Sequence, residues 1–199
     1  MSRTGWRLAT AADIDAVVRT LGAGFATDPV WGLWGFPDEP DRAAKLELHW
    51  TTFVRAGLKY DGVIMTPGGE AVAVWIPPGV PELDEDDEAA LGESTNALFG
   101  SRAPLLFEVY ERFAEAAPKV PEHWTLSLLA THPDHRGGGL GMALVEDFLE
   151  TVDARHEAAY LESTNPANLP RYERAGYQRY GSFEVPEGPT VTTMWRPAR

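Results

Sequence analysis

The chain contains no cysteine among its 199 residues. It therefore forms no disulfide bonds, and a mechanism that passes through an acyl-cysteine intermediate is excluded, as is a metal site built on thiolate ligands. The absence of cysteine does not by itself assign a cellular compartment.

Basic residues are scarce as well. The chain carries 17 lysine and arginine residues against 30 aspartate and glutamate residues, so its formal net charge is −13 at pH 7. Nucleic-acid binding draws its affinity from phosphates neutralised by lysine and arginine, so we expect no nucleic acid as a partner. An acidic protein attracts cationic amines weakly and in a salt-dependent way. The acidic run 84–88 is interpreted first as a solvated loop or helix start, with a position near a cationic acceptor as the alternative.

Long hydrophobic runs are also missing. No uninterrupted apolar stretch approaches the roughly 20 residues needed to cross a membrane, and no apolar core of a signal peptide follows Met1–Trp6. We therefore expect a cytoplasmic protein with no membrane partner. Hydrophobic residues still make up 44% of the chain, which is enough for one substantial core, so residues 1–199 are expected to form a single domain. Nothing in the sequence distinguishes a monomer from a homodimer.

Hydrophobic periodicity and turn residues predict an α/β protein with a central mixed sheet flanked by helices. Strands are expected at 6–8, 124–131 and 159–162, in a hairpin formed by 63–65 and 71–76, and in a closing hairpin around 186–189. Helices are expected at 13–25, 40–60 and 140–152, with one or two more within 85–117 and a two-turn helix that ends at Gly176. Residues 28–37 are expected to form a loop.

A run of glycines separates the strand 124–131 from the helix that follows it. The run is Arg136-Gly-Gly-Gly-Leu-Gly-Met142, and it follows a break at His132-Pro133-Asp134. A glycine loop that opens a helix exposes backbone N–H groups at the positive end of the helix dipole, so it favours a phosphate or pyrophosphate. A P-loop would need Lys-Ser/Thr after the glycines, and a dinucleotide fingerprint would need glycine at Met142. Neither pattern fits.

A second segment lies about thirty residues further along the chain. After the strand 159–162, Asn168 is a candidate N-cap residue, Pro170 suits the first turn of a helix, and Gly176 suits its end. Asn168 and Tyr172 are four residues apart, so they share one face of this short helix.

These two segments, in this order, resemble the GCN5-related N-acetyltransferases (GNATs), which bind acetyl-CoA. Arg136-x-x-Gly139-x-Gly141 matches the pyrophosphate loop of that superfamily, and Asn168-x-x-x-Tyr172-Glu-Arg-x-Gly-Tyr matches its second motif. Over nearly the full length the chain looks like the puromycin N-acetyltransferases, which usually have Gln at the position of Arg136 and Lys at that of Gly138. The agreement is patchy in 77–121.

The resemblance implies a mixed, mostly antiparallel sheet with a splayed strand pair at the acetyl-CoA site, and a role in antibiotic resistance. It implies that the main chain of Leu129 and Thr131 pairs with pantetheine, and that the N–H of Leu129 polarises the thioester carbonyl. Tyr172 is the expected general acid, because an ordinary phenol pKa of about 10 exceeds the roughly 8.5 of a thiol. A packed aromatic is the alternative for Tyr172, and a helix cap alone is the alternative for Asn168. The expected cofactor residues are Leu129, Ala130, Thr131, Arg136, Gly137, Gly138, Gly139, Leu140, Gly141, Met142, Asn168 and Tyr172.

The acceptor site and the general base are less well defined by sequence. Candidate acceptor residues are Asp28, Trp31, Trp34, His49 and Glu122. Trp31, Trp34 and Phe36 form either an aromatic wall for the acceptor or a plug between helices. Candidate bases are Glu47, His49, Glu122 and His123, with a water chain as the alternative. Trp50, Trp75 and Trp124 are assigned to the core. His132 and His135 have no third ligand at metal-binding spacing, so no metal is expected.

The function expected from these observations is direct transfer of an acetyl group from acetyl-CoA to a primary amine of a small molecule, with an aminonucleoside antibiotic such as puromycin as the candidate acceptor. Two alternatives stay open. One is acetylation of a lysine or N-terminal amine of a protein, and the other is a non-catalytic module that binds acyl-CoA as a sensor.

Overall fold

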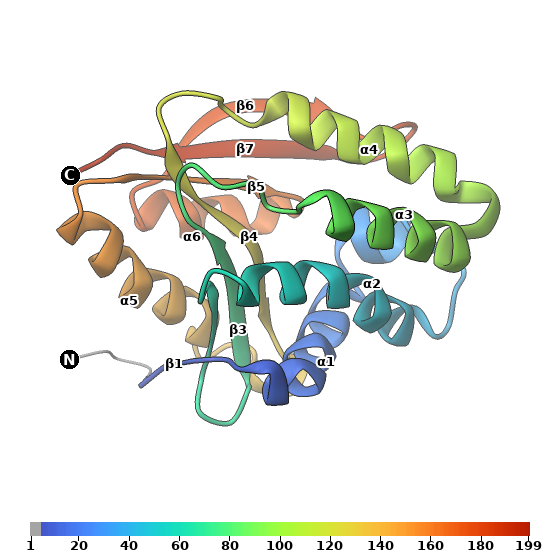
Figure 1. The fold of residues 1–199 in the computed structure, drawn as a ribbon, viewed down its shortest axis with the longest axis horizontal. Helices are drawn as coiled ribbons and strands as arrows, with labels where there is room; N and C mark the ends of the chain where they lie inside the picture. Colours follow the sequence, from blue (N-terminus) through green and yellow to red (C-terminus); the bar gives the residue numbers. More distant parts are fainter. Residues whose placement is uncertain (1–4) are drawn as a thin grey trace.

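A single sheet organises the computed structural model, which describes residues 5–199. Its seven strands lie in the order β1-β2-β3-β4-β5-β7-β6 (Figure 1). Residues 1–4, which begin the segment used to exclude a signal peptide, lie outside the described residues. The strands are β1 (Arg7–Leu8), β2 (Val63–Met65), β3 (Ala71–Ile76), β4 (His123–Thr131), β5 (Ala158–Ser163), β6 (Gln178–Glu184) and β7 (Thr190–Arg196).

Helices cover both faces of this sheet. On one face lie α1 (Ile14–Phe25), α2 (Arg42–Leu58), α3 (Glu85–Phe99) and α4 (Ala103–Ala116), and on the other lie α5 (Leu140–Ala154) and α6 (Leu169–Arg174) (Figure 1). The buried apolar side chains divide into two clusters, one on each face. Each helix contributes one apolar side to its cluster. In helix α1, for example, Val17, Val18 and Leu21 recur at helical spacing, and all three are buried.

Strands β4 and β5 are the parallel neighbours in the sheet, and the other paired strands run antiparallel. Their pairing extends from His123 with Ala158 to Leu126 with Leu161 and then ends, although both strands continue. The mixed, mostly antiparallel sheet with a splayed strand pair is therefore confirmed.

A β-bulge lies where the two strands separate. Val74 of β3 pairs with Leu128, whereas the next residue, Trp75, pairs with Leu126, so Ser127 is the extra residue of β4. Such a residue reverses the alternation of side chains along a strand. Leu126 accordingly belongs to the cluster under α5, while Leu128 belongs to the cluster under α1 and α2.

The expected loop at 28–37 was wrong in part, because Pro29–Trp34 forms a π-helical turn, η2. The Asp28 carboxylate caps this turn, accepting hydrogen bonds from the backbone N–H groups of Val30 at 2.9 Å and Trp31 at 3.0 Å. Gly32 allows the turn to pack on the end of α1, because a Cβ there would lie 2.4 Å from the carbonyl oxygen of Phe25.

The acidic run 84–88 begins helix α3, as its first interpretation expected. Asp84 is the N-cap residue, and its carboxylate accepts a hydrogen bond from the N–H of Asp87 at 3.0 Å. Lys59 Nζ lies 2.6 Å from the carboxylates of both Asp84 and Asp87. The expected helical segment 85–117 consists of two helices, separated at Gly100, whose φ is +53°.

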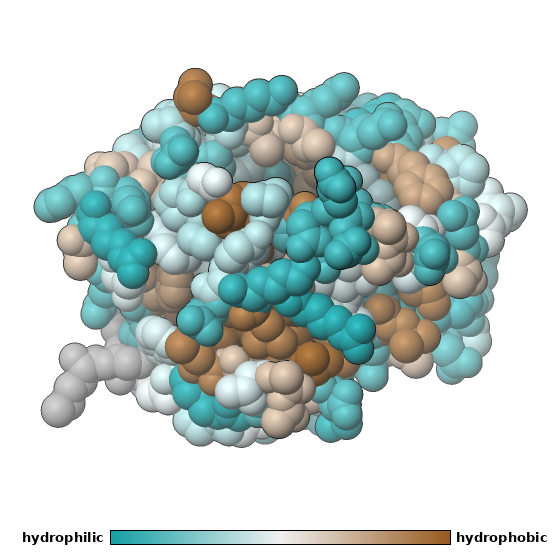
Figure 2. Space-filling model, in the orientation of Figure 1, coloured by the Kyte–Doolittle hydropathy of each residue, from teal (hydrophilic) through white to brown (hydrophobic). Residues whose placement is uncertain are grey.

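Hydrophilic side chains cover most of the face shown in Figure 2, with apolar residues exposed in smaller groups. Within residues 5–199, no helix has the length and hydrophobicity needed to cross a bilayer.

Candidate active site

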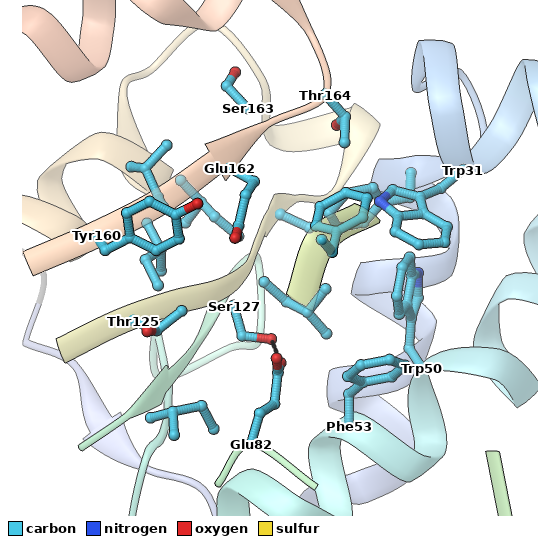
Figure 3. A pocket seen from close by; sticks show the side chains of 18 of the residues that line it. Trp31, Trp50, Phe53, Glu82, Thr125, Ser127, Tyr160, Glu162, Ser163 and Thr164 are labelled. Carbon is cyan, nitrogen blue, oxygen red and sulfur yellow. Dashed lines mark hydrogen bonds between the residues drawn. The ribbon is translucent and has the colours of Figure 1, made fainter. Parts of the chain in front are cut away.

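A cavity of about 1220 Å³ opens where β4 and β5 separate. The glycine loop, the start of α5 and helix α6 line one half of it. Turn η2, helices α2 and α4 and the segment 77–83 line the other half. We call these the loop half and the acceptor half. Figure 3 shows aromatic and carboxylate side chains that enter the cavity from separate elements.

The glycine loop presents backbone N–H groups to the loop half. Gly137 and Gly139 have φ values of +91° and +77°, a left-handed conformation that glycine adopts without strain. Gly139 is the N-cap residue of α5, and it places no side chain over the first helical turn, whose N–H groups lack intrahelical acceptors. Gly141 packs on β4, because a Cβ there would lie 2.7 Å from Thr131 Oγ1. This arrangement suits a bound phosphate.

Arg136 lies beside this loop and lines the same half. Its Nη2 donates a hydrogen bond of 2.7 Å to the carbonyl oxygen of Gly24, near the C-terminus of α1. That contact holds the guanidinium at the end of the cavity that contains the helix N-terminus. Gly138 does not line the cavity, in contrast to the other residues from Arg136 to Met142.

The main chain of β4 beyond the bulge faces the gap left by β5. The N–H of His132 donates to the carbonyl oxygen of Glu70, next to β3. Main-chain groups alternate between the two sides of a strand. Leu128 and Ala130 therefore face β3, whereas the main-chain groups of Leu129 and Thr131 face the gap, where β5 does not pair with them.

Hydrogen bonds at the C-terminal end of helix α6 fix the position of Tyr172. The N–H of Gly176 donates to the carbonyl oxygen of Glu173 at 3.0 Å, and the N–H of Tyr177 donates to that of Tyr172 at 3.1 Å. These two bonds form a Schellman motif, and Gly176, at φ +95°, is its left-handed residue. Tyr172 is buried and lines the cavity. Burial, assisted by the nearby Asp28 carboxylate, raises the pKa of its phenol.

Asn168 stands at the N-cap position of α6, but its side chain does not cap the helix. Its Oδ1 instead accepts a hydrogen bond from Arg171 Nη1 at 2.9 Å. The side-chain cap lies one turn earlier, where Asn165 Oδ1 accepts from the N–H of Ala167 at 3.0 Å. Asn168 lines the cavity, so its expected contact with acetyl-CoA stays a prediction.

Two carboxyl groups enter the acceptor half from opposite sides of β4 (Figure 3). Ser127, the bulge residue, donates a hydrogen bond from Oγ to Glu82 Oε1. Glu162 extends from β5, and its pKa is raised to about 8 by burial and, less strongly, by the charge of Glu82. Burial also raises the pKa of Glu82, opposed by the hydrogen bond from Ser127.

Aromatic rings form the wall facing these carboxyl groups. Trp31 lies with its ring centroid 5.2 Å from that of Trp50 and 6.2 Å from that of Tyr110, with which it stacks. All three line the cavity, as does Phe53. Asp28 supports this wall, because it caps the turn that carries Trp31 and also accepts a hydrogen bond of 2.7 Å from Thr164 Oγ1. Burial raises the pKa of Asp28 despite these hydrogen bonds.

Several residues expected at the acceptor site lie away from the cavity. Trp34 Nε1 donates to the carbonyl oxygen of Pro186 at 2.9 Å, and Arg102 stacks on the Trp34 ring, so this tryptophan joins η2 to the β6–β7 turn. Phe36 stacks on Phe99 in the core. Of the three expected aromatic residues, Trp31 alone lines the cavity.

His49 is fully buried behind this wall, between Trp31 and Phe99. Neither ring nitrogen has a hydrogen-bond partner among residues 5–199, and burial lowers the pKa of His49 to about 3. It does not line the cavity, and neither does Glu47. Glu122 and His123 do line it, and Glu122 is exposed.

Glu82 and Glu162 were not predicted as site residues from the sequence. A signal for Glu162 was present, because it is the charged residue of a strand whose other residues are buried. Glu82 had no such signal, because a fold-dependent hydrogen bond to Ser127 brings its segment to the cavity. Among residues 5–199, no group of three or more histidine, aspartate or glutamate side chains is placed to hold a metal ion.

The loop half fits acetyl-CoA. The N–H groups that open α5 suit its pyrophosphate, and the main chain of Leu129 and Thr131 suits the amides of its pantetheine arm. A carbon side chain at Gly141 would collide with Thr131 and disturb this arrangement. When bound, acetyl-CoA supplies an acetyl thioester.

Comparisons with known proteins agree with this geometry. Residues 107–179, which include the splayed strands, the glycine loop and α6, match the family model described as "Acetyltransferase (GNAT) domain". Among solved structures, the chain is similar to a Corynebacterium glutamicum protein described as histone acetyltransferase HPA2 and related acetyltransferase. The TM-score is 0.65 at 24% identity, over 98% of this chain and 96% of that one.

Two further structures share the fold over nearly their whole length. One is the Drosophila melanogaster polyamine N-acetyltransferase, described as forming N-acetylagmatine, with a TM-score of 0.57 at 18% identity over 96% of this chain and 98% of that one. The other is arylalkylamine N-acetyltransferase 2 of Aedes aegypti, with a TM-score of 0.60 at 17% identity over 98% of both chains. The family model therefore indicates a GNAT acetyltransferase domain in residues 107–179, and the solved structures share the fold of the whole chain.

Proposed function

We propose that this chain transfers the acetyl group of acetyl-CoA directly to the primary amine of a small molecule. One observation carries the proposal: a single cavity joins the N-terminus of α5 to a half lined by aromatic rings and carboxyl groups. Both substrates therefore have a place in the same cavity, and the absence of cysteine excludes an acyl-cysteine intermediate.

The residues of the loop half have defined roles in this proposal. The N–H groups of Gly137 and of residues 139–142, together with the Arg136 guanidinium, bind the pyrophosphate. The main chain of Leu129 and Thr131 binds the pantetheine arm, and the N–H of Leu129 polarises the thioester carbonyl. Tyr172 donates its phenolic proton to the departing thiolate. Its raised pKa keeps that proton in place at neutral pH.

The acceptor half favours an amine with an aromatic or apolar body. The rings of Trp31, Phe53 and Tyr110 suit such a body, and the carboxyl groups of Glu82 and Glu162 suit its cationic amine. Puromycin has this combination, because its reactive amine belongs to an O-methyltyrosyl group. It therefore stays a candidate acceptor, and with it a role in antibiotic resistance. The cytoplasmic location and the single domain expected from the sequence also stay predictions.

The test is thiol release from acetyl-CoA by the purified protein with 2-phenylethylamine, agmatine, puromycin or a lysine-containing peptide as acceptor. The proposal predicts saturable release with at least one of the three small amines. Release with the peptide alone would instead identify a protein acetyltransferase. Binding of acetyl-CoA without release in the presence of any acceptor would contradict catalysis and favour a sensor module.

A further inference from the structure

The carboxyl groups of Glu82 and Glu162 lie in the acceptor half without a basic partner. Among residues 5–199, no lysine or arginine forms an ion pair with either of them. Placing charged groups in a partly buried position lowers stability unless a partner compensates for the lost hydration. A pair of acidic groups that the fold leaves uncompensated therefore indicates a cationic ligand.

The fold holds this pair at the point where β4 and β5 separate. Glu162 is the last residue but one of β5, beyond the final pair of residues that join the two strands. Ser127 occupies the bulge of β4 and holds Glu82 through its hydroxyl group. Figure 3 shows both carboxyl groups directed toward the same part of the cavity, with Ser127 drawn between them. The pair therefore adjoins the gap in which the pantetheine arm is proposed to lie.

The surroundings of Glu162 favour a carboxyl group that exchanges a proton near neutral pH. Burial is the main cause of its raised pKa, the charge of Glu82 raises it further, and the neighbouring phenol of Tyr160 opposes the shift. The other titratable groups that line this half are Asp28 before η2, Glu88 of α3, Tyr110 and Glu111 of α4, Tyr160 of β5, and Lys119, Glu122 and His123 before and at the start of β4.

We propose that Glu82 and Glu162 bind the ammonium group of the acceptor and that Glu162 is the catalytic residue that removes its proton. This inference rests on the proposed function and adds the general base to it. A proton passes from the ammonium nitrogen to a Glu162 carboxylate oxygen, and the freed lone pair forms the C–N bond as the C–S bond breaks.

The protons balance in this scheme. Tyr172 gives its proton to the thiolate, and the second proton that the nitrogen loses on becoming an amide nitrogen restores the phenol. The proton on Glu162 leaves to solvent through the open cavity. The net change converts an ammonium ion and an acetyl thioester into an amide, a thiol and one released proton.

The first test compares Glu162→Gln, Glu82→Gln and Glu122→Gln with wild type in kcat/KM against pH. The control is Glu150→Gln, an exposed carboxyl on α5 outside this cavity. Wild type should show a rate that rises with pH through an apparent pKa near 8. Glu162→Gln should lower kcat/KM by roughly 100-fold or more and abolish this rising limb of the pH–rate profile. The Kd of acetyl-CoA should stay unchanged.

Glu82→Gln should raise the KM of the amine and move the same limb to lower pH, because it removes a negative charge that opposes ionisation of Glu162. If Glu82 had only a structural role, its substitution would not move the rising limb of the pH–rate profile to lower pH. If Glu162→Gln retains activity within a few-fold of wild type, or if Glu122→Gln loses it instead, the assignment of the base is overturned while the proposed function stands.

A second test does not depend on turnover. Calorimetric binding of 2-phenylethylamine to the protein saturated with CoA should be at least about ten-fold weaker in both Glu82→Gln and Glu162→Gln than in wild type or Glu150→Gln. Equal binding by all four proteins would overturn the ammonium site, whether or not any amine is acetylated.

Urea unfolding at pH 9 checks the fold: Glu162→Gln should be more stable than wild type, because the raised pKa makes ionised Glu162 unfavourable in the folded state above pH 8.

Discussion

Thr164, just past the end of β5, donates a hydrogen bond of 2.7 Å to Asp28, which lies 136 residues away in the sequence. The other carboxylate oxygen of Asp28 caps the turn that carries Trp31. This contact therefore ties one side of the splayed strands to the aromatic wall of the acceptor half.

Thr164→Val removes this hydrogen bond while nearly conserving side-chain volume. Because Asp28 is buried, one of its oxygen atoms is then left without that donor, and we expect the free energy of unfolding to fall by about 1–3 kcal/mol. Urea unfolding at pH 7 measures the change. Thr190→Val, at an exposed position of β7, should change it by less than about 0.5 kcal/mol. Equal effects of the two substitutions would show that the contact with Asp28 contributes little.

The glycine loop allows a comparison between adjacent residues. Gly139→Ala places a side chain at φ +77°, which costs about 1–2 kcal/mol and distorts the start of α5, so the KM of acetyl-CoA should rise by roughly ten-fold. Gly138→Ala should have little effect, because an added Cβ meets nothing within 4 Å and this glycine does not line the cavity. Steady-state kinetics with varied acetyl-CoA measures both. Equal KM values for the two variants would argue against the loop as the pyrophosphate site.

Trp31 and Trp34 provide a matched pair for the aromatic wall. Both Trp31→Leu and Trp34→Leu lose aromatic packing, but Trp31 alone lines the cavity. Trp31→Leu should lower the ratio of kcat/KM for 2-phenylethylamine to that for agmatine by about 2–10-fold, whereas Trp34→Leu should leave the ratio unchanged. The ratio is independent of the fraction of folded enzyme. A drop in both variants, or in neither, would remove Trp31 from acceptor recognition.

His49 should make the protein sensitive to acid. Its pKa is about 3 in the folded state and roughly 6.5 when unfolded, so the unfolded state binds a proton first as the pH falls. This contribution to stability is intact above pH 6.5 and declines below it, by about 2 kcal/mol at pH 5. His49→Leu should abolish that part of the decline between pH 7 and pH 5 in urea unfolding.

The control for this prediction is the exposed His156. Asn is suited to its backbone conformation at φ +55°, so His156→Asn should fold normally. That variant should lose stability between pH 7 and pH 5 as wild type does. If His49→Leu behaves in the same way as His156→Asn, protonation of the buried imidazole is not the cause of the decline.

The features predicted well from the sequence have local causes. Gly139 and Gly176 adopt left-handed conformations at the two ends of helices, and a short sequence pattern indicates both positions. The apolar periodicity of α1 and α5 likewise predicted their buried apolar side chains, whereas Asp147 of α5, expected to face outward, is buried. Helix α6 begins directly after Asn168, as the sequence predicted, although the side-chain cap belongs to Asn165 of the preceding turn.

The features that were missed depend on contacts between distant segments. The bulge at Ser127 arises from the register of β4 against β3, and nothing near Ser127 in the sequence encodes it. Glu82 lies in the cavity beside that bulge, where Ser127 donates a hydrogen bond to its carboxylate. His49 has the chemistry of a base, yet the packing of α2 places it behind the aromatic wall. Residue type predicted the kind of chemistry, whereas the fold decides which side chains reach the cavity.

The most direct test of the account is acetylation of a small amine by wild type and by Tyr172→Phe, followed by thiol release and by the mass of the product. Tyr180→Phe is the control, because Tyr180 is exposed on β6 and does not line the cavity. The account predicts a mono-acetylated amine from wild type and Tyr180→Phe, and turnover at least about 100-fold lower in Tyr172→Phe with unchanged affinity for acetyl-CoA. Full turnover by Tyr172→Phe would remove Tyr172 from the mechanism. No acetylated product from wild type with any small amine would contradict the central claim.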